Sequence, residues 1–100
     1  MKVEWTQARS EHIATRSDRY PGATDIEVAW TREVVADPRA VIQDPDPRST
    51  TGAVRIVGYS PTAGFVITVI ALHIHDQLWG VTAWQTSGAE RRNYQEMQHD

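Results

Sequence analysis

The second half of the chain contains three strand-like segments joined by short turns. Residues 53–59, 64–73 and 78–85 are rich in β-branched and aromatic side chains, which favour strands. The sequences between them, "SPTAG" and "HIHDQ", are short enough for hairpins. Consecutive strands that are joined by hairpins run antiparallel. The sequence therefore predicts an antiparallel sheet as the framework of the fold.

Two helices are predicted in the first half of the chain, after a short strand in "KVEWT". The segment "QARSEHIATRSDRY" (7–20) fits the first helix. Thr24 and Glu27 have the spacing of a capping box, so the second helix should begin at Asp25. It should end at Asp37, because Pro38 keeps that residue out of helical backbone angles.

A short strand at 40–43, a turn-rich loop at 44–52 and a C-terminal helix complete the predicted fold. Ser87 and Glu90 have the spacing of a second capping box, which would start the last helix. The expected order of elements is β-α-α-β-β-β-β-α in a single domain that spans residues 1–100. The predicted fold class is α+β, with a twisted antiparallel sheet packed by helices.

The composition is typical of one small folded domain, with 100 residues of which 40% are hydrophobic and 23% charged. The absence of cysteine excludes disulfides and thiolate chemistry and favours a reducing compartment. "MKVEWTQARSEH" lacks the apolar run of a signal peptide, and the apolar run at 65–72 is too short to span a bilayer. We therefore expect a cytoplasmic protein without membrane attachment. Because so small a domain buries a limited share of its surface, we also expect a homodimer or a partner chain.

Charge is unevenly distributed along the chain, whose formal net charge is -3. Residues 25–46 carry six acidic side chains and two arginines, a net of -4, and the other residues carry eight basic and seven acidic side chains, a net of +1. This argues against strong non-specific binding to nucleic acid but allows a local basic surface. Nine of the ten basic residues are arginines, which bind phosphate in a bidentate manner and are equally common in surface ion pairs.

Arg91, Arg92 and Tyr94 lie together on the predicted last helix. One interpretation is a solvated helix face on which Arg92 pairs with Glu96 at i,i+4. The other interpretation makes Arg91 or Arg92 a phosphate ligand and Tyr94 a stacking or hydrogen-bonding group. Their spacing alone does not decide between the two.

Three histidines invite a chemical interpretation. His12 precedes Arg16 by one helical turn, a pairing that suits proton transfer beside a bound phosphate. A boundary histidine that packs its ring is the favoured interpretation, because the spacing fixes no carboxylate partner. His73 and His75 in "HIHD" would point to the same side of an extended strand. A turn explains that segment as well, and no third ligand has a suitable spacing. We therefore predict no metal site.

Arg55 lies inside the strand segment "AVRIVGY", between two apolar neighbours. A charged residue in the middle of a strand usually faces solvent on the open side of a one-sided sheet. Trp84 or Gln85, from the end of the last strand, would meet it on that side. An exposed basic and aromatic sheet face is typical of an RNA-binding platform.

Four segments of the chain resemble, in order and spacing, the motifs of one protein family. "VEWT" resembles the family's opening "FEW" strand, and "AWTREVVADPRAVIQDPDP" resembles its second helix, which ends in "DP" before a strand and an acidic loop. "GAVRIVGYS" is similar to "ERFITIGRS", and "TAWQTSGAERRNYQE" is similar to the closing "SARKATRRERRYYE". The family is BrnT, a group of bacterial type II toxins within the RelE/ParE-like ribonuclease superfamily.

The resemblance implies the toxin of a type II toxin–antitoxin system, a metal-independent endoribonuclease that arrests growth by cutting RNA. It implies no cofactor, and as partners it implies RNA, including ribosome-associated mRNA, and a cognate antitoxin that neutralises the toxin. The RNA's own 2′-OH would attack the adjacent phosphate while basic side chains offset the developing charge. The resemblance makes Glu90 an accompanying motif residue. The catalytic candidates are Arg55, Arg91, Arg92, Tyr94 and, as a substitute for the family's histidine, His12; the RNA-binding candidates are Arg16, Trp84 and Gln85.

Differences from the family's pattern support an alternative. The family's "RKHG" segment has a histidine after its basic residues, whereas none follows Arg16 here, and "SARK" is replaced by "TAWQ". Many such toxins are basic, and this chain is acidic. The alternative hypothesis is a non-catalytic BrnT-like binding or regulatory module that has lost basic active-site residues. A third hypothesis is a domain whose sheet face binds a small ligand near Trp79 and Trp84.

Overall fold

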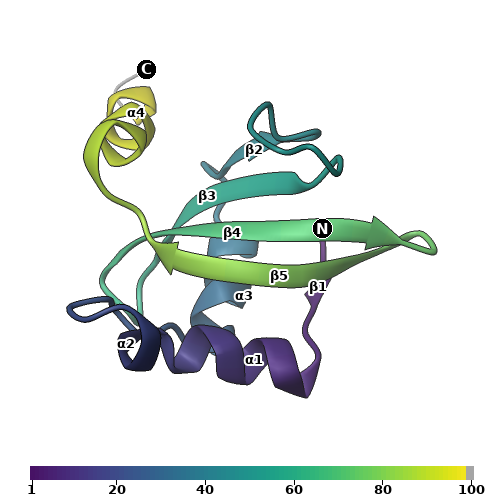
Figure 1. Cartoon of the computed structure of the whole chain (residues 1–100). Helices are drawn as coiled ribbons and strands as arrows, with labels where there is room; N and C mark the ends of the chain where they lie inside the picture. The colour runs from purple at the N-terminus through teal and green to yellow at the C-terminus, as the bar shows by residue number, and fades with distance from the viewer. Residues whose placement is uncertain (99–100) are drawn as a thin grey trace.

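Residues 1–98, which the computed structural model describes, contain a five-stranded mixed sheet and four helices (Figure 1). The predicted α+β class is confirmed. No helix in this range is long and apolar enough to cross a membrane. In chain order the elements are β1 (Val3–Glu4), α1 (Gln7–Ala14), α2 (Arg16–Arg19), α3 (Val28–Ala36), β2 (Val41–Gln43), β3 (Val54–Ser60), β4 (Phe65–Ile74), β5 (Gln77–Gln85) and α4 (Gly88–Met97).

The strands lie side by side in the order β1-β5-β4-β3-β2. The pairs β2–β3, β3–β4 and β4–β5 are antiparallel, as predicted. β1 instead pairs with β5 in parallel, with Val3 opposite Leu78 and Glu4 opposite Trp79, so the prediction of a fully antiparallel sheet is wrong at this edge. The hairpin argument concerns consecutive strands, and β1 and β5 are far apart in the sequence, so no local turn sets their relative direction.

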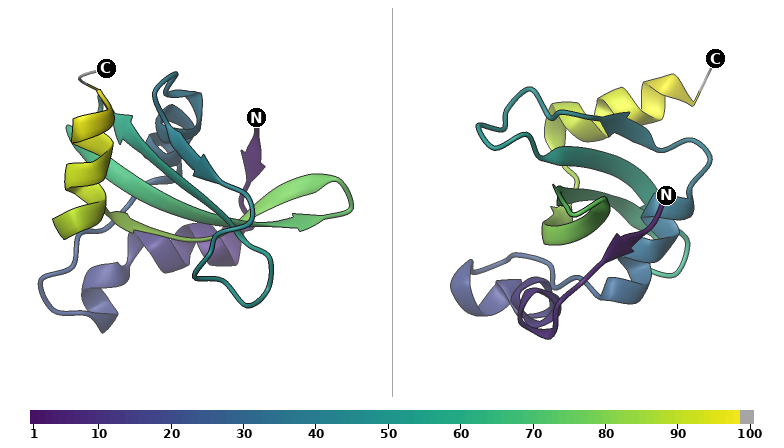
Figure 2. Two further views of the ribbon diagram at one scale, coloured as in Figure 1. Left: turned by 90° about the horizontal axis from the view of Figure 1, so that it is seen from above. Right: turned by 90° about the vertical axis from the view of Figure 1, so that its right-hand side faces the viewer.

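The hydrophobic core lies between one face of the sheet and the helices α1 and α3 (Figure 2). α3 comes so close to β3 that a Cβ added to Gly58 would lie 2.7 Å from the carbonyl oxygen of Val34. Only glycine permits this approach without a shift of the helix. The fully buried apolar side chains of the core include Ile13, Ile26, Val34, Val54, Ile56, Ile67 and Val69.

α4 lies on the opposite face of the sheet and covers only one end of it (Figures 1 and 2). Its buried residue Tyr94 packs against Val57 and Val66. The β4–β5 hairpin extends away from α4 (Figure 1), and Ile74 near its tip is 47% exposed. The sheet face opposite the core is therefore covered at the α4 end and open toward the hairpin.

Helix boundaries are where the structure departs most from the sequence-based expectations. The helix predicted over 7–20 is divided into α1 and α2 at Thr15. α3 begins later than the predicted Asp25, and the hydroxyl of Thr24 donates to Oε1 of Gln85 at 2.7 Å instead of capping the helix. α4 begins after Ser87, as predicted, but this serine makes no side-chain capping hydrogen bond. At both helix starts the expected capping box is absent, and a tertiary partner engages one of its two residues.

Candidate functional site

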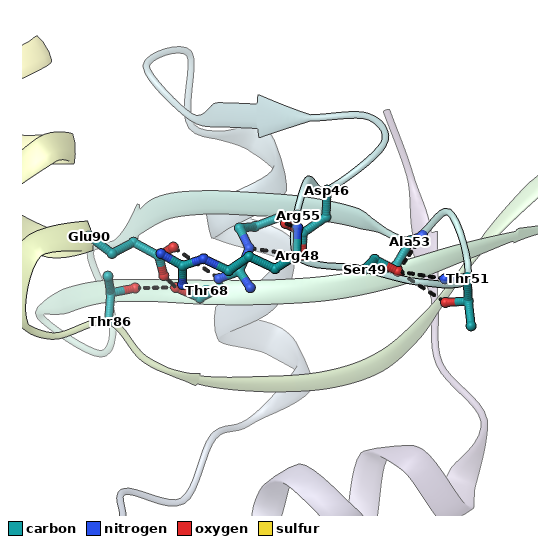
Figure 3. Close-up of polar contacts among 9 residues, drawn as sticks. All are labelled: Asp46, Arg48, Ser49, Thr51, Ala53, Arg55, Thr68, Thr86 and Glu90. Atoms are coloured by element: carbon teal, nitrogen blue, oxygen red, sulfur yellow. Dashed lines mark hydrogen bonds and ion pairs between the residues drawn. The ribbon is translucent and has the colours of Figure 1, made fainter.

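Arg55 lies on the face of β3 opposite the core, yet its side chain is only 8% exposed. Its Nε donates to Oδ2 of Asp46 at 3.0 Å, and its Nη1 donates to Oε2 of Glu90 at 2.9 Å (Figure 3). The guanidinium carbon is 5.5 Å from the centre of the Trp84 ring. The predicted contact of Arg55 with Trp84 is confirmed. The predicted solvent exposure of Arg55 is wrong, because the β2–β3 loop and α4 each place a carboxylate on its guanidinium.

The carboxylate of Glu90 connects α4 to the sheet through both of its oxygens. Oε2 accepts from Arg55, and Oε1 accepts from the hydroxyl of Thr68 at 2.6 Å (Figure 3). The hydroxyls of Thr68 and Thr86 are 2.8 Å apart, and both residues are fully buried. This network satisfies polar groups that would otherwise be buried without partners on an apolar strand.

The loop between β2 and β3 holds Asp46 in position through its own backbone (Figure 3). The N–H of Asp46 donates to the carbonyl of Ala53 at 2.7 Å, and its Oδ1 accepts from the N–H of Arg48 at 3.1 Å. Oγ of Ser49 accepts from the N–H groups of Thr51 and Ala53, both at 3.1 Å. The carboxylate that pairs with Arg55 is thus fixed by an ordered turn.

Tyr94 is tied into the fold by a short hydrogen bond from its hydroxyl to Oδ2 of Asp37. The same carboxylate accepts from the N–H groups of Tyr59 and Arg39, each at 2.9 Å. Burial and the Asp37 carboxylate raise the pKa of Tyr94 to about 12. Burial raises the pKa of Asp37, but the hydrogen bonds from Tyr94, Tyr59 and Arg39 outweigh it and lower that pKa below its usual value. Tyr94 therefore carries its proton at physiological pH.

We expect Tyr94→Phe to remove the phenol that titrates at about pH 12 and to lower the free energy of unfolding by about 1–3 kcal/mol. Because the pKa of Tyr94 is raised on folding from a usual value of about 10, the hydrogen bond stabilises the fold fully below about pH 10. That stability is lost as the pH rises through the folded-state pKa. Phenolate absorbance and urea unfolding measure the two effects. The exposed Tyr20→Phe is the control, and equal titration curves for Tyr94→Phe and the wild type would contradict the assignment.

Four of the predicted site residues line one pocket of about 400 Å³ where α2, β5 and α4 meet. Arg16 comes from α2, Trp84 and Gln85 come from the end of β5, and Arg91 comes from α4. We call this the junction pocket. Its walls also include Thr24, which precedes α3, and Thr86, whose hydroxyl lies against Thr68. The structure thus brings together all three RNA-binding candidates and one of the catalytic candidates.

The junction pocket has a positive lining. None of the residues that line it within 1–98 is acidic, and two of them are arginines. The guanidinium of Arg16 lies 5.2 Å from the ring centre of Tyr20, and the side chain of Gln85 is oriented by the hydroxyl of Thr24. Guanidinium groups bind phosphate, and an indole ring stacks on bases. The pocket therefore combines groups that suit a nucleotide.

His12 and Arg92 do not line the junction pocket. Burial and three neighbouring arginines on α1 and α2 lower the pKa of His12, so its imidazole is neutral at physiological pH. Arg92 is exposed on α4, and the ion pair with Glu96 that one interpretation expects is not formed in the described residues. Of the five catalytic candidates, only Arg91 belongs to the pocket.

His73 lies near the end of β4, and His75 is in the two-residue turn of the β4–β5 hairpin, where the predicted turn is confirmed. His75 and Asp76 have φ angles of 50° and 63°, in the left-handed region that two-residue hairpin loops require. Nε2 of His73 lies 3.1 Å from Oδ2 of Asp44. Nowhere along residues 1–98 do three metal-ligating side chains come together.

The partners of Arg55 are the functional-site residues that sequence reasoning misses. The sequence indicates a helix cap at Glu90 and a turn residue at Asp46, and neither pattern points to a strand arginine. Thr68 is the one available signal, because it places a hydroxyl inside the apolar run "FVITVIAL". The register brings Thr68 next to β3 opposite Val57, two residues from Arg55 and on the same face of the sheet.

Comparisons with known proteins do not assign the chain to a family. No family model matches the chain, and no curated protein matches its sequence. The resemblance to BrnT toxins rests on the motifs quoted above.

Proposed function

We propose that this chain is the toxin component of a type II toxin–antitoxin system, a BrnT-like domain that binds and cleaves RNA in the cytoplasm. The observation that carries the proposal is the junction pocket, which Arg16, Arg91 and Trp84 line together with no acidic residue among its described lining residues. A volume of about 400 Å³ lies in the usual range for sites that bind small ligands or single nucleotides.

Each group of the pocket has a role in the proposed RNA complex. Arg16 and Arg91 bind the phosphates on either side of a nucleotide whose base stacks on Trp84. Gln85, held by Thr24, supplies an amide to the base edge or the ribose. Single-stranded RNA suits such a pocket, because its unpaired bases can leave the stack and lie against an aromatic side chain.

In the proposed reaction the ribose 2′-oxygen forms a bond to the adjacent phosphorus, and the bond from phosphorus to the 5′-oxygen breaks. The products carry a 2′,3′-cyclic phosphate and a 5′-hydroxyl. The 2′-OH proton passes to an acceptor, and the leaving 5′-oxygen takes up a proton. The arginines offset the charge that develops on the phosphate. Arg91 is the catalytic candidate that lines the pocket, whereas His12 lies outside it. A cognate antitoxin would block the pocket.

The environment of Arg55 and Tyr94 favours a second candidate function, a non-catalytic RNA-binding module. Arg55 is already paired with Asp46 and Glu90, and Tyr94 is already bound to Asp37. Two groups that the resemblance assigns to catalysis therefore serve the fold in this structure. RNA binding in the junction pocket is common to both candidates, and cleavage separates them.

We expect the double variant Arg16→Gln, Arg91→Gln to bind a labelled single-stranded RNA about ten-fold or more weakly than the wild type at low salt, because two phosphate contacts are lost. The slope of log affinity against log salt concentration should also become shallower. Fluorescence anisotropy measures both quantities. Arg32→Gln, an exposed arginine of α3, is the matched control for loss of charge. If the double variant and the control bind equally, the junction pocket is not the RNA site.

Cleavage is tested with purified protein and in cells on the same variants. A toxin should arrest growth on expression, leave cyclic-phosphate ends on RNA, and lose both effects in the double variant. Co-expression of the product of the adjacent gene should restore growth if that gene encodes the antitoxin. RNA that is bound but stays intact, with normal growth, would exclude the toxin and leave the binding module.

A further inference from the structure

A second pocket, separate from the junction pocket, lies at the β4–β5 hairpin and has a volume of about 580 Å³. The proposed RNA site uses none of its residues. We call it the hairpin pocket. Its apolar lining consists of Leu72, Ile74, Trp79 and Val81, and its charged or titratable groups are Arg9 and His75.

The hairpin pocket lies where the uncovered part of the sheet face opposite the core meets Thr6 and Arg9 at the start of α1. Leu72 is paired with Trp79 and Ile74 with Gln77, so these side chains lie on one face. α4 covers the other end of this face, and the hairpin extends away from it (Figures 1 and 2). Ile74 is 47% exposed. A concave surface with several large apolar side chains is the usual mark of a binding site.

Arg9 gives the hairpin pocket a positive charge. None of the residues that line it in the described chain is Asp or Glu. Arg9 forms no ion pair with another residue of the range 1–98, and its guanidinium is available to an outside anion. In a chain with a formal net charge of -3, this is a local excess of positive charge beside an apolar wall.

We propose that the hairpin pocket binds a small amphiphilic carboxylate. The apolar body of the ligand lies against Leu72, Ile74 and Trp79, and its carboxylate forms a bidentate ion pair with Arg9. A neighbouring depression of about 300 Å³ shares Leu72 and Val81 with the pocket. Ile70 and Trp84 extend the apolar surface along the sheet there, beside the charged Asp46, Arg48 and Arg55. The pocket and the depression together therefore have room for a chain-shaped ligand such as an acyl carboxylate.

The test uses sodium decanoate as the probe, below its micelle concentration, on the full chain labelled with ¹⁵N. We expect saturable shifts of the Trp79 indole N–H and of the backbone amides of Leu72 and Ile74. Decyltrimethylammonium, which has the same chain and the opposite charge, should bind about ten-fold more weakly. Arg9→Gln should weaken decanoate binding by a similar factor, and the exposed Arg32→Gln should leave it unchanged.

Three results would overturn the proposal. Equal binding of the two amphiphiles would show adsorption to apolar surface without carboxylate recognition. Shifts centred away from the hairpin would place the ligand elsewhere. A dimer in sedimentation experiments that Leu72→Asp dissociates would show that a second copy of the chain covers this face. Because Arg9 and Leu72 lie outside the junction pocket, each result is independent of RNA binding.

Discussion

Replacing Arg55 with methionine should lower the free energy of unfolding by about 3–5 kcal/mol, because Asp46 and Glu90 would keep their charges without a cation. Asp46 is almost completely buried and Glu90 largely so, and neither can regain full hydration in the folded state. In a domain of this size the change corresponds to a fall in melting temperature of at least about 12 °C. Urea unfolding followed by circular dichroism measures it.

Two further variants separate the loss of the ion pair from the loss of a long side chain. Arg32→Met removes an exposed arginine and should change stability by less than about 0.5 kcal/mol. Combining Arg55→Met with Asp46→Asn and Glu90→Gln removes all three charges and should recover much of the lost stability. If Arg55→Met unfolds no more easily than Arg32→Met, the network contributes nothing to the fold. Arg55→Lys is a milder replacement in case the methionine variant does not fold.

Gly80→Ala should lower the free energy of unfolding by about 1–3 kcal/mol, because a Cβ at this position would lie 2.4 Å from ring carbons of Trp5. The Trp5 ring packs against the main core cluster and cannot move away without disturbing its neighbours. β5 therefore has glycine where the N-terminal segment crosses it. Thermal unfolding measures the effect, and Thr82→Ala, on the same strand, is the control.

A double variant tests whether the ring of Trp5 is the cause. Trp5→Leu alone should also destabilise the protein, because it removes packed aromatic surface. Combined with Gly80→Ala, however, it makes room for the new methyl group. The double variant should therefore lose less stability than the two single variants lose together. Strict additivity would show that the cost at Gly80 comes from the backbone of β5 and not from contact with Trp5.

Much of the sheet is predictable because its signals are local. The β-branched segments and the short turns around 60–64 and 75–76 specify two consecutive hairpins without reference to the rest of the chain. β1 is predicted as a strand, but its parallel partner β5 begins more than seventy residues later. No turn or periodicity in the sequence indicates that pairing, which forms only when the strands pack in the tertiary structure.

The prediction of the two capping boxes is wrong for a related physical reason. Thr24 and Glu27 have the spacing of a capping box, and so have Ser87 and Glu90. A capping hydrogen bond contributes only about 1 kcal/mol, so a tertiary partner of similar or greater strength can replace it. Glu90 gains a buried guanidinium and a hydroxyl from the sheet, which no local group offers.

The candidate site, too, is predictable from the sequence only in part. The resemblance points to Arg16 and Arg91, and the position at the end of the last strand points to Trp84 and Gln85. The structure places all four around one pocket, although more than sixty residues separate Arg16 from the rest. The same resemblance points to Arg55, whose availability depends on Asp46 and Glu90, nine and thirty-five positions away. The sequence specifies the type of each residue, whereas the protonation, pairing and burial of its side chain depend on its neighbours in space.

By itself, the sequence determined the fold class, the consecutive hairpins and the chemical groups available for binding. These follow from side-chain type and from periodicity, which act over a few residues. Only the tertiary structure decided that Arg55 is enclosed by two carboxylates and that Tyr94 is bound to Asp37. It also decided that Arg16 and Arg91 line the junction pocket and Arg9 the hairpin pocket. The physical reason is that ion pairs and pockets form between segments far apart in the chain, where distance and desolvation, and not sequence spacing, set the interaction energy.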